Sequence, residues 1–178
     1  MKNQTLETVL EIPEGISIQA NGMTVELEGK GKKNSKTFTA QGVTLSVQGN
    51  QFKITAARSN KKGLRFSNTI YAHVNNMIQG LQKGYEYKLT AVYSHFPMNI
   101  QVKGSTVEIH NFIGQKEIRK ARIMPGTEVS IKGKDLTVKG HDLEAVGQTA
   151  ANIENATRLT GKDLRVFQDG VYILKEKR

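Results

Sequence analysis

The chain contains one ten-residue pattern twice, as LSVQGNQFKI at residues 45–54 and as VSIKGKDLTV at residues 129–138. In both copies apolar residues alternate with polar ones on either side of a glycine, which is Gly49 in the first copy and Gly133 in the second. Alternation is typical of half-buried β-strands, and a glycine between two such runs supplies the positive φ of a tight turn. Each copy therefore predicts a β-hairpin.

The correspondence extends upstream of this hairpin. IPEGI at residues 12–16 matches FPMNI at residues 96–100, again 84 residues further on, and Val25-Glu26-Leu27 resembles Val107-Glu108-Ile109. A long period that occurs only twice indicates one small domain that has been duplicated.

Each run of strands is followed by one predicted helix. In residues 64–81 apolar side chains recur every three or four positions, with Ser67 as the expected N-cap and Gly84 beyond the end. Asp142 is expected to cap a second helix that stops near Gly161. The predicted fold is α+β: a tandem duplication of a small domain, with antiparallel β-sheets packed around one α-helix in each copy.

The second copy continues past its helix. Residues 165–168 and 171–174 flank Asp169-Gly170, a dipeptide typical of two-residue hairpin turns. We therefore predict a first α+β domain at residues 1–83, and a second at 84–178 that carries an added C-terminal β-hairpin. Asn21-Gly22 is likewise interpreted as a two-residue hairpin turn in the first domain.

Charge is the main guide to function. The 178 residues include 26 Lys and Arg against 16 Asp and Glu, a net charge of +10, which favours a polyanionic partner such as nucleic acid. The absence of cysteine excludes disulfide scaffolds, cysteine zinc sites and thiol catalysis. No run of 18 apolar residues occurs, so we expect no membrane partner and a cytoplasmic location.

The sequence offers no pattern for catalysis. Its four histidines lack metal-ligand spacing, and Glu26 and Glu108, at matching strand positions, are interpreted as solvent-facing rather than as an acid/base pair. We therefore predict that the protein is not an enzyme and needs neither a cofactor nor a metal.

Candidate RNA contacts come from basic clusters and from one stretch of small residues. Gly147-Gln148-Thr149 is interpreted as a helix start whose amides approach a phosphate, with close packing on the sheet as the alternative. For each basic cluster, a merely solvated surface is the alternative. The candidate residues are Lys116, Arg119, Lys120, Arg122, Gly147, Gln148, Arg158, Lys162, Arg165, Lys175, Lys177 and Arg178.

Several strings, in order along the chain, resemble the L-six family of large-ribosomal-subunit proteins in its archaeal and eukaryotic form. The strings are NMIQG at 76–80, YSHFPM at 93–98, NFIGQK at 111–116, AVGQTAANIE at 145–154 and RVFQDGVYI at 165–173. In the family, Glu usually precedes the lysine that corresponds to Lys116; this chain has Gln115 there.

The resemblance implies a tandem of two α+β domains and a structural role in the large ribosomal subunit. It further implies binding to large-subunit rRNA, chiefly through the second domain, near the sarcin-ricin loop and the translation-factor-binding region. The implied partners are this rRNA, neighbouring large-subunit ribosomal proteins and translation factors nearby. An alternative function is a protein-interaction module that docks neighbouring ribosomal proteins or factors and binds RNA nonspecifically. Sequence-selective, salt-sensitive binding of an rRNA fragment would separate the two.

Overall fold

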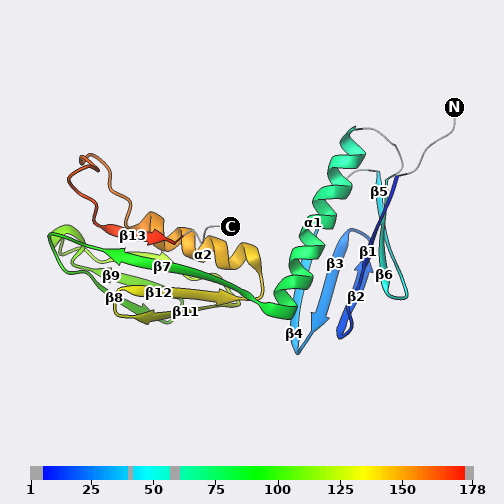
Figure 1. Cartoon of the computed structure of the whole chain (residues 1–178), viewed down its shortest axis with the longest axis horizontal. Helices are drawn as coiled ribbons and strands as arrows, with labels where there is room; N and C mark the ends of the chain where they lie inside the picture. The colour runs from blue at the N-terminus through cyan, green and yellow to red at the C-terminus, as the bar shows by residue number, and fades with distance from the viewer. Residues whose placement is uncertain (1–5, 40–41, 57–60, 175–178) are drawn as a thin grey trace. The chain divides into compact units, whose positions relative to one another are not determined.

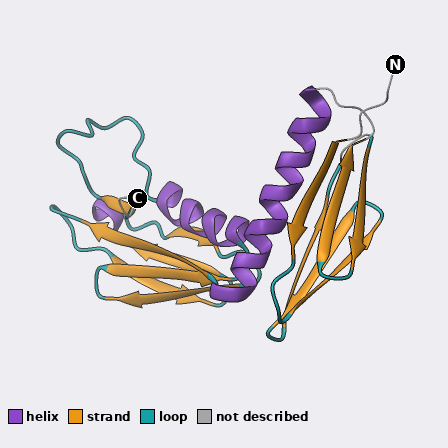
Figure 2. Ribbon diagram, turned by 45° about the vertical axis from the view of Figure 1, so that its right-hand side comes forward, coloured by secondary structure: helices purple, strands orange, loops and turns teal. Residues whose placement is uncertain are grey.

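The computed structural model describes residues 6–39, 42–56 and 61–174. The chain divides into two compact units, Met1–Gly84 and Tyr85–Arg178, which we call unit 1 and unit 2. In its described residues, each unit contains two antiparallel sheets and one α-helix (Figures 1 and 2).

Unit 1 consists of strands that precede a single long helix. Its two sheets have the strand orders β1-β6-β5 and β2-β3-β4. Its elements are β1 (Leu6–Glu11), β2 (Ile16–Asn21), β3 (Thr24–Gly29), β4 (Lys32–Thr37), β5 (Val43–Gln48), β6 (Gln51–Ala56) and α1 (Lys61–Lys83). The core of unit 1 lies where the apolar face of α1 meets the sheets. Ile70 and Val74 on the helix are at most 2% exposed, as are Leu27, Phe52 and Ile54 on the strands.

Unit 2 repeats this order of elements. They are β7 (Tyr85–Val92), β8 (Asn99–Lys103), β9 (Thr106–His110), the 3-10 helix η1 (Phe112–Gly114), β10 (Arg119–Arg122), β11 (Thr127–Lys132), β12 (Asp135–Gly140), α2 (Leu143–Ala156) and β13 (Gly170–Ile173). Its sheets have the orders β11-β12-β7-β13 and β10-β9-β8. With β7 in the place of β1, the two units have the same strand orders except for β13. The predicted α+β fold and its duplication are confirmed.

The predicted glycine turns are formed, with one shift. Gly49 (φ 58) and Gly133 (φ 63) begin the corresponding turns β5–β6 and β11–β12. The turn between β2 and β3 differs, because Asn21 still pairs with Thr24 in the ladder and the turn residues are Gly22 and Met23. Gly22 has the positive φ of 62 that such a turn needs.

The predicted helix caps are partly correct. Ser67 is not an N-cap, because α1 already begins at Lys61 and the buried Ser67 hydroxyl donates to the Gly63 carbonyl at 3.0 Å, which satisfies it inside the helix. Gly84 follows α1 with a φ of 74, as expected. Asp142 does cap α2, since its Oδ1 accepts from the Glu144 amide at 3.0 Å.

The predicted C-terminal hairpin is wrong. β13 pairs with β7 instead, and residues 165–168 form no strand. The outward amides of β13 are bonded elsewhere: Val171 donates to Thr157 Oγ1 at 2.9 Å and Ile173 donates to Glu154 Oε1 at 3.2 Å. Because the end of α2 satisfies this sheet edge, a hairpin partner has no amides to pair with.

Candidate nucleic-acid interface

Three segments of unit 2 that are far apart in the chain meet at one surface. They are residues 93–98 between β7 and β8, residues 111–116 around η1, and residues 157–169 between α2 and β13 (Figure 1). We call this surface the loop face. Hydrogen bonds and ring contacts join the three segments.

Asp169 fixes the longest segment to the first. Its carboxylate is almost fully buried, accepts from the Ser94 amide at 2.6 Å through Oδ1, and lies 3.1 Å from His95 Nδ1 through Oδ2. The His95 ring packs on Phe167 with 5.3 Å between the ring centroids. A buried carboxylate with two partners is a structural group, so Asp169 holds the two segments together and is not itself open to a ligand.

The η1 segment is fixed to the same loop. Asn111 Nδ2 donates to the Pro97 carbonyl at 3.0 Å. A Cβ atom at Gly114 would lie 3.3 Å from the Phe96 ring, so glycine at this position (φ 69) allows the backbone to approach the ring. Phe96 remains 45% exposed. The loop face therefore has an ordered frame from which an aromatic ring projects.

Four predicted site residues lie on the loop face with exposed side chains: Lys116, Arg158, Lys162 and Arg165. Lys162 Nζ lies 5.4 Å from the centroid of Phe167. The Arg165 amide donates to Asp163 Oδ1 at 2.9 Å, which fixes the local turn. These four cations are free to contact phosphates because none forms an ion pair with a described residue.

Arg119 has a different role. Its guanidinium donates to the carbonyls of Ala156 at 3.0 Å and Arg158 at 3.4 Å, and to Gln115 Oε1 at 3.2 Å. It also stacks over the Phe112 ring at 4.4 Å from the centroid. Arg119 therefore joins the end of α2 to the η1 segment, and most of its donors are used inside the unit.

Lys120 and Arg122 point to the opposite side of β10 from buried Ala121. Lys120 Nζ lies 3.7 Å from Glu108 Oε1, while Lys103 Nζ and His110 Nε2 lie 3.9 Å and 3.7 Å from Oε2 of the same residue. The interpretation of Glu108 as solvent-facing is wrong, because these long side chains cover it and leave the residue 8% exposed. Glu108 partly compensates the charges of Lys103 and Lys120.

Gly147 and Gln148 lie within α2, not at its start, so the predicted approach of free helix-end amides is wrong. The alternative, close packing on the sheet, holds for Thr149, which is fully buried with its Oγ1 3.1 Å from that of Thr127, whereas a Cβ at Gly147 would meet nothing within 4 Å. Gln148 Nε2 donates to Asn152 Oδ1 at 2.8 Å, and Asn152 donates to the Arg122 carbonyl at 3.0 Å. The structure thus links Gln148, through Asn152, to the backbone of Arg122 on β10, and leaves the space at Gly147 open.

Lys175, Lys177 and Arg178 lie outside the described residues. The sequence analysis missed the aromatic side chains of the loop face, Tyr93, His95, Phe96 and Phe167. Phe, Tyr and Trp make up only 6% of the residues, yet these side chains occupy two of the strings that carry the family resemblance. The family resemblance of those two strings was therefore the signal in the sequence that could have identified these side chains. Lys134 Nζ over the Tyr93 ring, at 4.4 Å, adds a fifth cation nearby.

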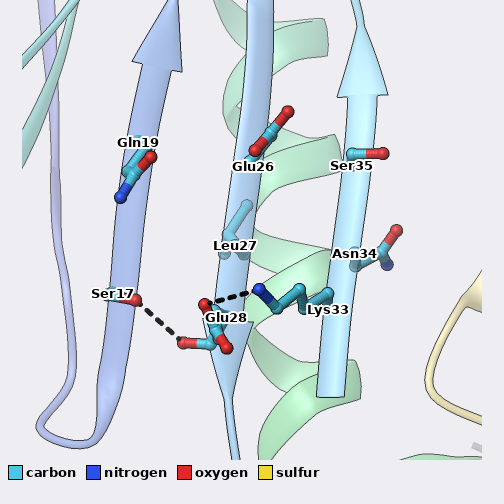
Figure 3. A pocket seen from close by; sticks show the side chains of 8 residues that line it. All are labelled: Ser17, Gln19, Glu26, Leu27, Glu28, Lys33, Asn34 and Ser35. Atoms are coloured by element: carbon cyan, nitrogen blue, oxygen red, sulfur yellow. Dashed lines mark hydrogen bonds and ion pairs between the residues drawn. The ribbon is translucent and has the colours of Figure 1, made fainter. Parts of the chain in front are cut away.

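Among the described residues, neither the pocket on the β2-β3-β4 sheet nor the shifted pKa of Tyr85 belongs to a catalytic arrangement. A pocket of about 310 Å³ on the β2-β3-β4 sheet presents Gln19, Glu26 and Ser35 side by side, and Lys33 pairs with Glu28 at 3.3 Å (Figure 3). Burial, and to a smaller extent the charges of Asp142 and Tyr87, raises the pKa of the Tyr85 phenol above its ordinary value.

The described residues contain no cluster of three or more acidic, histidine or cysteine side chains that could hold a metal. Among these same residues, no helix has the length and apolar content needed to cross a membrane.

Exposed cations beside the exposed rings of Phe96 and His95, on a duplicated α+β fold, are typical of proteins that bind nucleic acid. A family model described as Ribosomal protein L6 matches residues 96–170. The chain is 42% identical over 180 residues to Large ribosomal subunit protein uL6 of Sulfurisphaera tokodaii, with 99% of this chain and 96% of the relative covered. It is 41% identical to uL6 of Ignicoccus hospitalis and 42% identical to uL6 of Aeropyrum pernix, each with 94% of this chain and 93% of the relative covered. The chain belongs to the Ribosomal protein L6 family, which confirms the resemblance, and this family is structural rather than enzymatic.

Proposed function

We propose that the protein is a structural component of the large ribosomal subunit and binds large-subunit rRNA through the loop face of unit 2. The observation that carries the proposal is that hydrogen-bonded segments of one face carry exposed Lys116, Arg158, Lys162 and Arg165 together with the exposed rings of Phe96 and His95. The names of the uL6 relatives support the assignment to the large subunit.

The chemistry of the loop face suits structured RNA with unpaired bases. Exposed Lys and Arg contact phosphates without reading sequence, and aromatic rings stack on bases that leave a helix. Because Asp169 holds the 157–169 segment against the 93–98 segment, the cations and rings keep a fixed spacing. RNA whose phosphates and bases match this spacing binds without a large loss of conformational entropy in the protein. The loop face therefore selects RNA by shape.

The finer assignment follows the family resemblance. We propose that the RNA bound lies near the sarcin-ricin loop and the factor-binding region, with neighbouring ribosomal proteins and translation factors close by. Gly147, Gln148 and Arg122 form a second contact in this proposal, because the open helix surface at Gly147 lets RNA backbone come close. Lys120 contributes less, since Glu108 lies against it.

The test measures binding of the full chain to an rRNA fragment containing the sarcin-ricin loop as a function of salt. Each phosphate contact contributes a slope of about −0.7 to −0.9 in log affinity against log salt. Lys162→Ala/Arg165→Ala should flatten the slope by about 1.4 to 1.8 and leave the melting temperature unchanged. The control Lys32→Ala/Lys132→Ala removes the same charge from exposed sites elsewhere. An equal change of slope in both double variants would mean that net charge, not the loop face, governs binding.

A further inference from the structure

Unit 1 has a groove of about 800 Å³ at the N-terminal half of α1. Its floor is apolar: Met23 follows β2, Phe38 follows β4, and Phe66 lies on α1. Phe38 is 8% exposed, with its ring centroid 5.9 Å from that of His73, whereas Phe66 is 39% exposed. Phe66 therefore stays at the surface of unit 1, and Met23 lines the same groove. A methionine side chain adapts to apolar partners of varied shape.

The rim of the groove is cationic. Lys62 and Arg65 line it from α1, and neither side chain forms an ion pair or hydrogen bond with a described residue. Residues 61–83, the whole of α1, contain no Asp or Glu. Two cations that pair with no described residue, on a helix without acids, therefore favour an anionic partner.

The two glutamates of β3 do not compensate this rim. Glu26 and Glu28 project from one side of β3, where they surround the pocket of Figure 3. The residues between and beside them, Val25 and Leu27, are buried in the core that α1 covers. Successive strand residues point to opposite faces, so these glutamates lie on the face away from the groove.

We propose that this groove binds an acidic, amphipathic segment of a neighbouring protein. The apolar side chains of this segment would contact Met23, Phe38 and Phe66. Its Asp or Glu residues would pair with Lys62 and Arg65. RNA fits this groove less well. Of the two rings in its floor only Phe66 is open, since Phe38 is 8% exposed, and a hollow lined by methionine and a buried ring matches apolar side chains better than flat bases.

The first experiment places a benzophenone side chain at position 66 of the full chain and irradiates purified large subunits. The expected product is a protein adduct whose cross-linked peptide is acidic and carries apolar residues. The control site is Leu64, also exposed at 47% and about 160° around α1 from Phe66. An rRNA adduct at position 66, a basic peptide, or a yield no higher than at position 64 would overturn the proposal.

The second experiment uses the free full chain and so does not depend on ribosome assembly or on the proposed rRNA site. A fluorescent synthetic helix of repeated Leu-Leu-Glu-Glu should bind, whereas the same helix with Lys in place of Glu should not. Phe66→Ala, and separately Lys62→Glu/Arg65→Glu, should weaken binding at least about fivefold, and Lys132→Glu should not.

The outcomes separate this proposal from the function proposed above. Absence of binding by the Glu helix, or equal binding of the Glu and Lys helices, would overturn the groove proposal. So would preferential binding of oligouridylate that is sensitive to Phe66→Ala. Loss of the rRNA salt slope in the loop-face variant leaves the Glu-helix result unaffected, because the two surfaces share no residue.

Discussion

Replacing Arg119 by Ala should destabilise unit 2 rather than weaken rRNA binding directly. The part-buried, charge-assisted bond to the Ala156 carbonyl contributes about 1.5 kcal/mol. The contact with the Phe112 ring adds about 0.5 to 1 kcal/mol, and a cation at the end of α2 about 0.5 kcal/mol. The two outer bonds, to Arg158 and Gln115, are exposed and are left out of the sum. The expected loss is thus about 2.5 to 3 kcal/mol, or roughly 10 °C or more in the melting temperature of a domain this size.

The assay is thermal unfolding followed by circular dichroism, with Arg122→Ala as the matched control. Arg122 lies on the same strand with an exposed side chain, so its removal should change the free energy of unfolding by about 0.5 kcal/mol or less. Below the unfolding transition, Arg119→Ala should keep the salt slope of rRNA binding. Equal melting temperatures for the two variants, together with a slope flattened by Arg119→Ala, would refute the reasoning and make Arg119 a phosphate contact.

Three further predictions concern α2 and β7. Gly147→Ala should stabilise the protein by about 0.5 to 1 kcal/mol in urea unfolding, because alanine favours a helix and meets no neighbour. It should weaken rRNA binding by about tenfold if RNA approaches there, and unchanged affinity would remove Gly147 from the interface. Asp142→Ala should cost about 1 kcal/mol in the same assay through loss of the α2 cap, whereas Asp142→Asn should recover most of it. Tyr85 has a raised pKa in the folded state, so its contribution to stability is present below the ordinary phenol pKa and is lost as pH rises above it. Tyr85→Phe should therefore flatten the alkaline fall of the melting temperature, and an identical fall in both proteins would contradict this.

Local patterns were enough to predict the duplicated fold. Alternation in residues 45–54 and 129–138, with Gly49 and Gly133 between the strands, depends on neighbours in the chain, and the structure has both hairpins as expected. Asp142 is similar, because an N-cap bonds to an amide two residues away. Such features need no knowledge of tertiary contacts.

The errors arose where distant residues compete with local signals. Asp169-Gly170 has the sequence of a hairpin turn, but the Ser94 amide and His95, more than 70 positions away, bind the Asp169 carboxylate and bury it. Arg119 belonged to a basic cluster by sequence, yet its donors meet the carbonyls of Ala156 and Arg158. Glu108 is covered by side chains from two neighbouring strands. The spacing of residues along the chain does not show which of these distant side chains meet in the folded protein.

The central claim is that the loop face of unit 2 contacts large-subunit rRNA, and directed hydroxyl-radical probing tests it most directly. Because the chain has no cysteine, Leu164→Cys gives one attachment point for a tethered iron chelate, at a position 62% exposed and beside the cations of the loop face. Gln19→Cys, on the acidic outer face of unit 1, is the matched control. In reconstituted large subunits, the probe at position 164 should cleave rRNA strands at and around the sarcin-ricin loop, and the probe at position 19 should leave them intact. Cleavage of these strands from position 19 but not from position 164 would contradict the assignment.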